Sequence, residues 1–294
     1  MKRRFMIAGV LVIACLGNAI QASALTVTTS SDADALVGAL LGSGITLSPG
    51  TATYTGDALA AGTFTGGAAS GIGINSGVIL ATGRASDAVG PNQNAVDADN
   101  GLDDTSTALG EPGDADLSAL SGGFPTFDAA VLEFDFVSAG GDLYFNFVFA
   151  SEEYNEWVDS VFNDVFAFYV DGVNIGLVPG TTDPVSINTV NGSMNSAYFN
   201  DNTVDSGLAP YDIEYDGFTD VFTASYMGLA AGTHSMVLAI ADSSDAFLDS
   251  AVFLQAGSFD DEPTPPTNGV PDGGSTLILL SMAVLGSTAI RKRR

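Results

Sequence analysis

Acidic residues beside apolar segments are the side chains of this sequence that could do chemistry. They occur directly after one alternating apolar segment, directly before the next, and together in a later loop: Glu152 and Glu153, Asn163 and Asp164, and Asp242, Asp245 and Asp249. Ca²⁺ takes about six to eight oxygen ligands in a flexible arrangement. We therefore expect one Ca²⁺ ion where these segments meet, held by Glu152 or Glu153, Asp164, and Asp242 or Asp249. The alternative is that each side chain caps a turn or accepts a bond from a backbone N–H.

A second acidic cluster lies in a long polar segment and consists of Asp97, Asp99, Asn100, Asp103 and Asp104, with Glu111, Asp114 and Asp116 beyond it. Its beginning is similar to an EF-hand loop. However, Gly101 comes one position too early, and no oxygen ligand follows at the required spacing. We interpret this cluster as an acidic surface loop, with a weak Ca²⁺ site as the alternative.

Few residues are suited to catalysis. His234 is the only histidine, and the only cysteine, Cys15, lies in a predicted leader. A cysteine nucleophile and multi-histidine metal sites are therefore not expected in the mature protein. His234 begins a predicted strand, where a structural imidazole is the expected role. We predict no enzyme. The alternative is a glycoside hydrolase that pairs Glu152 with Asp164 or Asp249.

Aromatic residues near the first acidic pair suggest a further alternative. Tyr154 and Trp157 lie beside Glu156, and exposed rings at these positions could stack on a sugar. A carbohydrate-binding module for exopolysaccharide is therefore the second interpretation of the domain. A role for both rings in the core or in anchoring a loop is the simpler reading.

The elements that position these residues are mostly β-strands. Apolar and polar residues alternate in segments 131–137 and 143–149, which a Gly-containing turn joins into a predicted hairpin. Asp171-Gly172 predicts a type I′ hairpin between 165–170 and 173–178, and Asn191-Gly192 a third hairpin after 185–190. Further strands are expected at 219–226, 234–241 and 250–259.

In the body of the chain, helix is expected only near its N-terminus, apart from the C-terminal hydrophobic helix described below. Ser31 and Asp34 suggest a capping box, and apolar residues continue at helical spacing to Leu41. Short strands with regular turns and one short helix predict an all-β fold, an antiparallel β-sandwich that is jelly-roll-like.

The charge of the chain is very unevenly distributed. Seven of the eight Lys and Arg residues lie in the two terminal segments, so residues 25–269 hold one cation, Arg84, and 34 of the 35 acidic residues. No basic patch is available for phosphates, which excludes nucleic acid as a partner. Negative charge of this magnitude also opposes compaction unless salt or bound cations balance it.

The N-terminal segment resembles a signal peptide for the Sec export machinery. Lys2, Arg3 and Arg4 precede an apolar stretch, and the small residues Ala22 and Ala24 frame a cleavage site after Ala24. Lipid attachment at Cys15 is the alternative.

The C-terminal segment has three parts: a motif of Val270, Pro271, Asp272, Gly273 and Gly274, an apolar run at 275–290, and the cations Arg291, Lys292, Arg293 and Arg294. The 16 apolar residues would span roughly 24 Å as a helix, against about 30 Å of bilayer hydrocarbon. The cations are expected to stay on the cytoplasmic side of the membrane, so the chain before the motif lies on the opposite side.

This C-terminal segment resembles the PEP-CTERM class of sorting signals in its VPDxG form, with Gly273 where Ser is also common. The resemblance implies processing by an exosortase. An ordinary C-terminal membrane anchor is the alternative.

The body of the chain resembles the choice-of-anchor L family over residues 31–259. The resemblance rests on blocks such as 77–83, 132–136, 149–154, 163–168 and 249–254. It implies surface display and a β-rich domain, with no known catalytic activity.

We therefore divide the chain into a signal peptide (1–24), a β-sandwich domain (25–259), an acidic Pro-rich linker (260–269) and a sorting signal (270–294). We expect transient anchoring in the inner membrane, followed by a structural or adhesive role at the cell surface or in the extracellular matrix. Exopolysaccharide or another envelope component is the expected partner.

Overall fold

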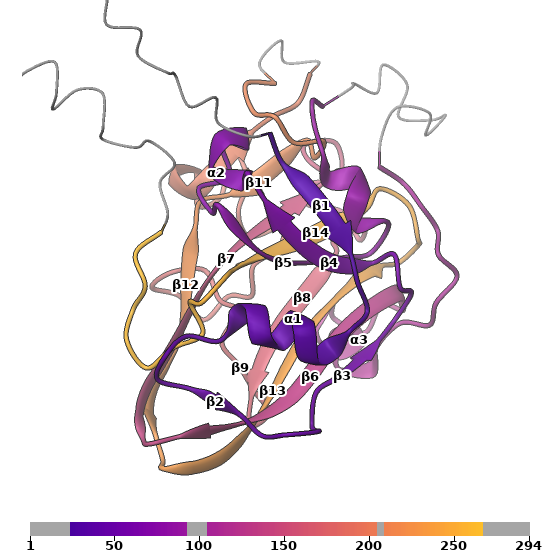
Figure 1. Cartoon of the computed structure of the whole chain (residues 1–294). Coiled ribbons are helices and arrows are strands. Elements are labelled where there is room, and N and C mark those ends of the chain that lie inside the picture. The colour runs from indigo at the N-terminus through magenta and orange to yellow at the C-terminus, as the bar shows by residue number, and fades with distance from the viewer. Residues whose placement is uncertain (1–23, 93–104, 205–208, 267–294) are drawn as a thin grey trace, which may run out of the picture.

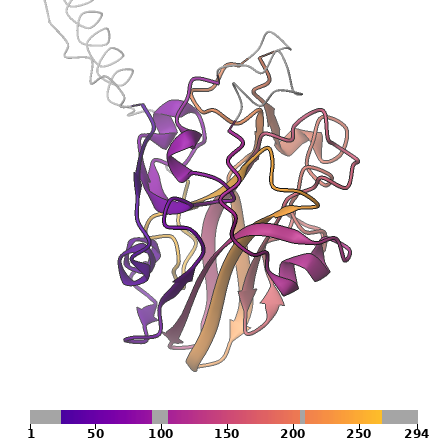
Figure 2. The ribbon, with the colours of Figure 1, turned by 90° about the vertical axis from the view of Figure 1, so that its right-hand side faces the viewer.

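The computed structural model describes residues 24–92, 105–204 and 209–266. In these ranges the chain forms two antiparallel β-sheets packed face to face, with a few short helices (Figures 1 and 2). The expected antiparallel β-sandwich is confirmed. The predicted leader, the acidic residues at 97–104 and the sorting signal lie outside the described residues. None of the described helices is both long and apolar enough to cross a membrane.

The described strands form two sheets, and every pairing of strands within each sheet is antiparallel. The first sheet has the order β1 (Thr26–Thr29), β4 (Ala61–Thr65), β5 (Ser76–Ala81), β14 (Ser250–Gln255), β7 (Gly141–Ser151), β11 (Gly217–Thr219) and β10 (Phe199–Asp201), with β12 (Phe222–Leu229) also paired to β7. The second sheet has the order β2 (Thr46–Leu47), β6 (Thr126–Ser138), β13 (Gly232–Ser243), β8 (Val165–Val170) and β9 (Val173–Asn174), with β3 (Thr53–Thr55) also paired to β6.

Phenylalanine side chains fill the space between the two sheets. Phe147 of β7 lies edge-on to Phe166 and Phe168 of β8, with ring centroids 5.4 Å and 5.0 Å apart. Phe145 lies 4.9 Å from Phe168. Such edge-to-face pairs add stability beyond the area that they bury. The inward face predicted from the alternation in 143–149 is confirmed.

The outer faces of both sheets are also covered in part. A second apolar cluster, which includes Phe64, Tyr215 and Phe253, lies on the outer face of the first sheet. On the outer face of the second sheet, Leu117 of α3 (Ala115–Leu120) packs in a small cluster of Ala and Val side chains. Further short helical segments are α2 (Gly67–Ser70), η1 (Ala85–Ala88) and η2 (Ser196–Tyr198).

The strands β6 and β7 belong to different sheets, so the hairpin predicted from segments 131–137 and 143–149 is wrong. The turn after β6 carries the chain from the second sheet to the first, and the turn between β12 and β13 also joins the two sheets. An aromatic face suits strands that lie opposite one another across a core as well as strands that lie side by side. The alternation therefore could not distinguish the two arrangements.

The hairpin predicted at Asp171-Gly172 is confirmed, since β8 pairs with β9. Asp171 and Gly172 have φ angles of 48° and 80°, the positive values that a type I′ turn requires. The second strand is shorter than predicted because the Asn174 side chain accepts bonds from the backbone N–H groups of Phe168 and Gly176.

The hairpin predicted after segment 185–190 is wrong, because this segment forms turns rather than a strand. The Asn191 side-chain oxygen accepts bonds from the N–H groups of Ser193 and Met194, both at 2.8 Å. Of the later strands, 234–241 lies within β13, whereas 219–226 and 250–259 only partly coincide with β12 and β14.

The predicted N-terminal helix is confirmed as α1 (Ala33–Leu40), which crosses in front of the strands in Figure 1. Its N-cap is Asp32 rather than Ser31, and the Asp32 carboxylate accepts the N–H of Ala35 at 3.1 Å. Leu36, Val37 and Leu40 are buried against the inner core.

The first part of the predicted linker is attached to the domain. We call residues 260–266 the C-terminal strap. The Asp260 carboxylate accepts bonds from the N–H groups of Ser43 and Gly44, at 2.9 Å and 2.8 Å. The carbonyl groups of Thr264 and Pro265 accept bonds from the Asn146 and Gln255 side chains, at 2.7 Å and 3.3 Å. The strap is therefore not a free spacer.

Candidate metal centre

The predicted acidic segments meet at one end of the sandwich. Glu152 follows β7 and Asp249 precedes β14, and these strands pair at Ser151 and Ser250. Asp164 precedes β8 and Asp242 lies in β13, and these strands pair at Val165 and Ala241. The Ser250 hydroxyl joins the two sheets by donating to Asp164 Oδ2 at 2.7 Å. The convergence of the three segments is therefore confirmed.

Asp249 and Glu152 accept hydrogen bonds mainly from the backbone. Asp249 accepts the Thr105 hydroxyl at 2.9 Å and the Thr107 N–H at 3.0 Å. Glu152 accepts the N–H groups of Thr105 and Asp216, at 3.3 Å and 3.0 Å. Both carboxyl groups are buried. These contacts fit the alternative in which the acids hold loops in place.

A glycine makes room for one of these carboxyl groups. A Cβ atom on Gly83 would lie 1.7 Å from Asp249 Oδ2. The Asp249 carboxyl group can therefore lie beside Gly83 and accept the Thr107 N–H only because residue 83 lacks a side chain.

Asp164 and Glu153 occupy the adjoining position in the second sheet. Asp164 Oδ1 accepts the Ser243 N–H at 2.9 Å, and Glu153 Oε2 accepts the Asp164 N–H at 3.2 Å. Asn163 is turned away, since its side-chain oxygen accepts the Asn188 N–H. Asp245 is half-buried and accepts the Phe247 N–H. The Asn163 side-chain oxygen is therefore directed to the loop that carries Asn188.

Asp242 differs from the other acids. It is 1 % exposed, and neither of its carboxyl oxygens has a hydrogen-bond partner. The Thr82 side chain lowers the pKa of Asp242, and its hydroxyl also accepts the Ser250 N–H at 2.9 Å and donates to the Ser250 carbonyl at 3.5 Å. A buried, unpartnered carboxyl group is costly and usually has a functional or structural explanation.

Burial raises the pKa of five acids in this group: Glu153, Asp164, Asp242, Asp245 and Asp249. Burial and the neighbouring Asp164 charge raise the pKa of Glu153. Burial raises the pKa of Asp164 to about 7 and that of Asp249 to about 7, although hydrogen bonds to Ser250 and Thr107 oppose this. Burial and the charges of Asp164 and Asp249 raise the pKa of Asp242 well above its ordinary value. Without a cation, part of this group therefore binds protons near neutral pH.

The described residues include no group of three or more His, Cys, Asp or Glu side chains arranged to hold a metal ion. The hydrogen bonds above explain this, because most of the carboxyl oxygens are turned toward backbone donors. A Ca²⁺ ion would have to draw in Asp242 together with an oxygen of a neighbouring acid. The predicted Ca²⁺ site thus remains a prediction.

The glycan-stacking role predicted for Tyr154 is wrong, because the side chain is fully buried. Its hydroxyl donates to the Val190 carbonyl at 2.7 Å, and its ring lies 4.7 Å from that of Phe199. Trp157 is half-buried, with its ring edge-on to Phe162 at 5.0 Å. Neither residue forms an open aromatic platform.

Asp128 is a structural acid that the sequence analysis missed. It is buried at a bulge in β6 and has a φ of 47°. Its carboxylate accepts the N–H groups of Leu109 and Glu111, at 2.9 Å and 2.6 Å. The one available signal was an Asp inside an otherwise apolar strand segment.

His234 has the structural role expected for it. Its Nδ1 lies 2.7 Å from Asp171 Oδ2, and its Nε2 lies 2.9 Å from the Ala230 carbonyl. The side chain is partly buried, which lowers its pKa, but the bonds to Asp171 and Ala230 raise the pKa overall. Since Nε2 faces a carbonyl, no serine hydroxyl occupies the position that a catalytic triad requires.

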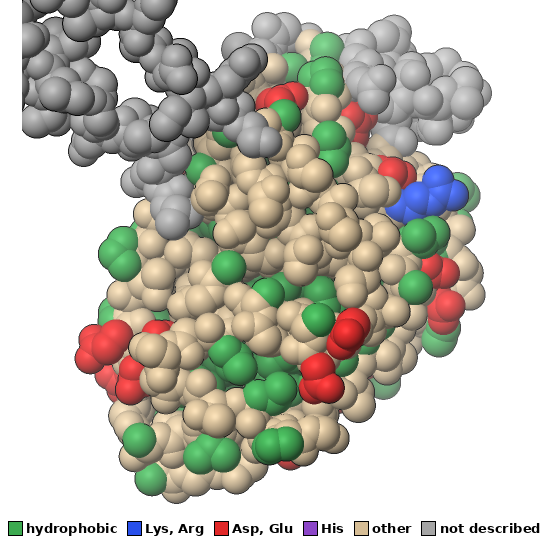
Figure 3. Space-filling model, viewed as in Figure 1, with side chains coloured by type: hydrophobic (Ala, Val, Ile, Leu, Met, Phe, Trp, Pro, Cys, Tyr) green, Lys and Arg blue, Asp and Glu red, His purple; other side chains and the backbone are tan. Residues whose placement is uncertain are grey.

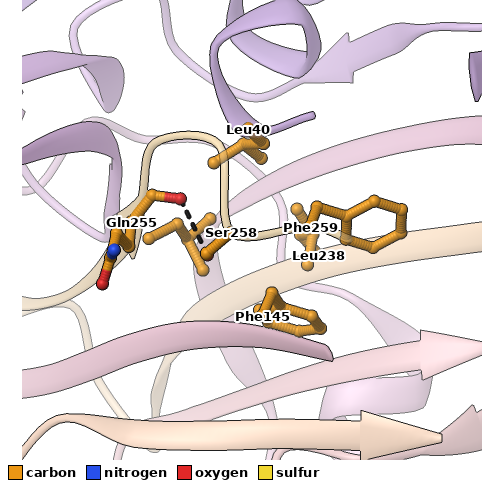
Figure 4. Close-up of a pocket in the computed structure, with 7 residues that line it drawn as sticks. Leu40, Phe145, Leu238, Gln255, Ser258 and Phe259 are labelled. Atoms are coloured by element: carbon orange, nitrogen blue, oxygen red, sulfur yellow. Dashed lines mark hydrogen bonds between the residues drawn. The ribbon is translucent and has the colours of Figure 1, made fainter. Parts of the chain in front are cut away.

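Two hollows differ in what they could hold. A small apolar cavity in the core, lined by Leu40, Phe145, Leu238 and Phe259, has a volume of about 10 Å³, which is the size of one water molecule (Figure 4). An open groove of about 590 Å³ lies on the outer face of the second sheet and is lined by Asp116, Ala119, Leu120, Tyr169, Gly172, Ser235 and Val237. Only the groove is large enough for a ligand.

Two family models match the chain. The choice-of-anchor L domain model matches residues 25–260, and the VPDSG-CTERM motif model matches residues 269–294. No curated protein and no solved structure shows significant similarity to the chain.

Proposed function

Since the chain belongs to the choice-of-anchor L family and ends in a sorting motif that implies export and exosortase processing, we propose that its β-sandwich is a non-catalytic structural or adhesive module. In this proposal the Sec machinery exports the chain. The C-terminal segment then holds it in the inner membrane until processing, after which the domain acts at the cell surface or in the extracellular matrix.

The observation that carries the proposal is that the buried carboxyl groups accept hydrogen bonds from the protein itself. The candidates for the catalytic pair of a glycosidase are Glu152, Asp164 and Asp249. All three are buried and accept bonds from backbone or hydroxyl donors. A glycosidase needs two carboxyl groups that flank a bound sugar in an open site. These contacts support a role in stabilising loops rather than in catalysis.

We further propose that Ca²⁺ stabilises this end of the sandwich by binding at Asp242, with Asp164 and Asp249, whose charges act on Asp242, as the candidates for further ligands. Support comes from the unpartnered oxygens of Asp242 and from the excess of acidic over basic side chains, part of which is visible in Figure 3. A bound divalent cation would allow these carboxyl groups to ionise and would offset their mutual repulsion.

Calorimetric titration and thermal unfolding of the chelator-treated protein test this Ca²⁺ proposal. We expect Ca²⁺ to raise the melting temperature by several degrees at pH 8, because a ligand at about 100 times its Kd stabilises the folded state by about 2.7 kcal/mol. Asp242→Asn should abolish the Ca²⁺ effect while leaving the ion-free protein at least as stable, because it removes a buried carboxyl group that must either ionise in the core or keep a proton that the unfolded chain releases.

Glu133→Gln is the matched control, since Glu133 is an exposed acid on β6 and should leave the response to Ca²⁺ unchanged. The absence of both binding heat and a change in melting temperature would contradict the proposal. A full response in Asp242→Asn would also contradict it.

The groove on the second sheet favours glycan binding as a second candidate function. Tyr169 lines it, and burial together with the charges of Asp116 and Asp114 raises the pKa of Tyr169. An aromatic ring beside carboxylates suits a neutral sugar, whose hydroxyl groups can donate to the acids. The excess of acidic residues disfavours an anionic polysaccharide.

Affinity electrophoresis in gels that contain neutral polysaccharides tests the glycan-binding candidate. We expect retardation that Tyr169→Ala removes, because the ring supplies the only aromatic surface of this groove. Trp157→Ala, outside the groove, should leave the retardation unchanged. Equal mobility of the protein in gels with and without polysaccharide would exclude glycan binding. An equal loss of retardation in Tyr169→Ala and Trp157→Ala would exclude binding in this groove.

A further inference from the structure

The C-terminal strap determines where the chain leaves the folded domain. Its carbonyl groups are bound by Asn146 of β7 and by Gln255, the last residue of β14. Asp260 and Tyr144 also exchange backbone hydrogen bonds, at 2.9 Å and 3.1 Å. Asp260 therefore lies beside β7 in the plane of the first sheet. Asn146 alternates with the core residues Phe145 and Phe147, so the part of the strap that its side chain binds lies on the outer face of this sheet.

The N-terminal strand begins at the same end of this sheet. Thr26 pairs with Thr65, Thr65 pairs with Ser76, and the Ser76 carbonyl accepts the N–H of Ala256, the residue after β14. Neighbouring strands are about 4.8 Å apart, so Thr26 lies about 15 Å from the end of β14. Both ends of the described chain therefore leave from one end of the first sheet.

The acidic group lies at the opposite end. Strand β14 runs from Ser250, next to Asp249, to Gln255, next to the strap. Its six residues cover about 17 Å. Phe247 lies in the loop that carries Asp245 and Asp249 and is 62 % exposed.

Chain length limits how far the strap can move from a membrane-inserted tail. Ten peptide units separate Pro265 from Ser275, the first residue of the apolar run, and they reach at most about 36 Å. The headgroup layer occupies about 6 Å of this. A folded domain of this size has a radius of gyration of about 18 Å and is about 45 Å across. The tether is therefore shorter than the domain is wide.

The surface beside the strap has side chains that suit a lipid interface. Met227 of β12 is 62 % exposed, and the Tyr144 hydroxyl lies 3.8 Å from its sulfur atom. Tyrosine and other amphipathic side chains are favoured where hydrocarbon meets water. The Asp260 carboxylate accepts the N–H groups of Ser43 and Gly44, so donors of the protein itself solvate its charge.

We propose that the end of the first sheet that carries the strap, with Tyr144 and Met227, faces the surface of the bilayer while the tail is inserted. The acidic end of the sandwich then points away from the membrane. Because Arg84 is the only Lys or Arg residue of the exported body, tether length and shape hold this orientation rather than attraction to anionic lipids. The inference rests on the proposed membrane insertion of the tail.

Fluorescence quenching with single-cysteine variants tests this orientation. The full-length chain from cells that lack the exosortase is reconstituted into vesicles whose lipids carry a nitroxide on the headgroup. Cys15 is the only native cysteine and is removed with the predicted leader, so Met227→Cys and Phe247→Cys each give one labelling site. The two positions are equally exposed. We expect quenching several-fold stronger at position 227 than at 247, with little change in high salt.

Lengthening the tether provides the control. Insertion of about 20 Gly and Ser residues after Pro266, which span about 25 Å on average, changes no contact of the strap and should nearly remove the difference. Equal quenching at the two positions with the native tether would overturn the orientation, as would stronger quenching at 247. Failure of the chain to float with the vesicles would overturn the membrane insertion itself, and flotation therefore separates the two results.

Discussion

The ion-free protein should become less stable as the pH rises from 5 to 8, which is the reverse of ordinary acid unfolding. Burial raises the pKa of Asp164 and that of Asp249 to about 7, against about 3.9 for Asp in an unfolded chain. At a pH between these two pKa values, the carboxyl groups are protonated in the folded state and ionised in the unfolded state. The free energy of unfolding therefore falls as the pH rises through this window. Each carboxyl group contributes at most about 4 kcal/mol, since one pKa unit corresponds to about 1.4 kcal/mol.

Two further acids extend the trend. Burial raises the pKa of Glu153 and of Asp242, so both continue to lose protons as the pH rises further. His234 contributes with the same sign, because its raised pKa means that stability is lost as it deprotonates in the folded state. His234→Gln removes this contribution and is the control that isolates the carboxyl groups.

Urea unfolding of the chelator-treated protein at a series of pH values measures the effect. We expect the free energy of unfolding to decrease by several kcal/mol from pH 5 to 8, and Asp242→Asn to reduce the decrease. Added Ca²⁺ should flatten the profile if it binds at these acids, because it replaces the protons. A free energy of unfolding that increases over this range would contradict the shifted pKa values.

The position of the acidic group could be predicted from the sequence, whereas its hydrogen bonds could not. Glu152, Asp164 and Asp249 each adjoin an apolar strand, and strands of one sandwich end at common edges. The donors come from distant segments, since the N–H group that binds Glu152 Oε2 belongs to Asp216, 64 residues away. Local patterns give no information about such partners.

The same limit applies to the strands. The alternation that predicts the inward face of 143–149 is a property of one strand, and Phe145 and Phe147 do face the core. Which strand lies beside it depends on long-range pairing, and β7 pairs with β14 rather than with the preceding strand. The strap was missed for a similar reason. Its Pro-rich composition suggests a spacer, but the Asn146 and Gln255 side chains bind its carbonyl groups.

Phe147→Ala should destabilise the protein by about 3–5 kcal/mol, because the variant leaves a cavity where several aromatic rings meet. Phe147 is fully buried between the sheets and contacts Phe166, Phe168 and, at 5.8 Å, Phe222. No strand pairing joins β6 to β7 or β12 to β13 in the described chain, so the two sheets depend on this side-chain packing.

Urea unfolding measures this loss of stability. Phe247→Ala is the matched control, since Phe247 is exposed and its substitution should cost less than about 0.5 kcal/mol.

Phe147→Ala also tests how the acidic end of the sandwich depends on the aromatic core. Asp164 and Ser250 come from different sheets and are joined by one hydrogen bond of 2.7 Å, so sheets that shift against each other would separate them. Phe147→Ala should therefore weaken any Ca²⁺ response as well. Loss of stability with an unchanged Ca²⁺ response would show that the acids keep their arrangement independently of the aromatic core.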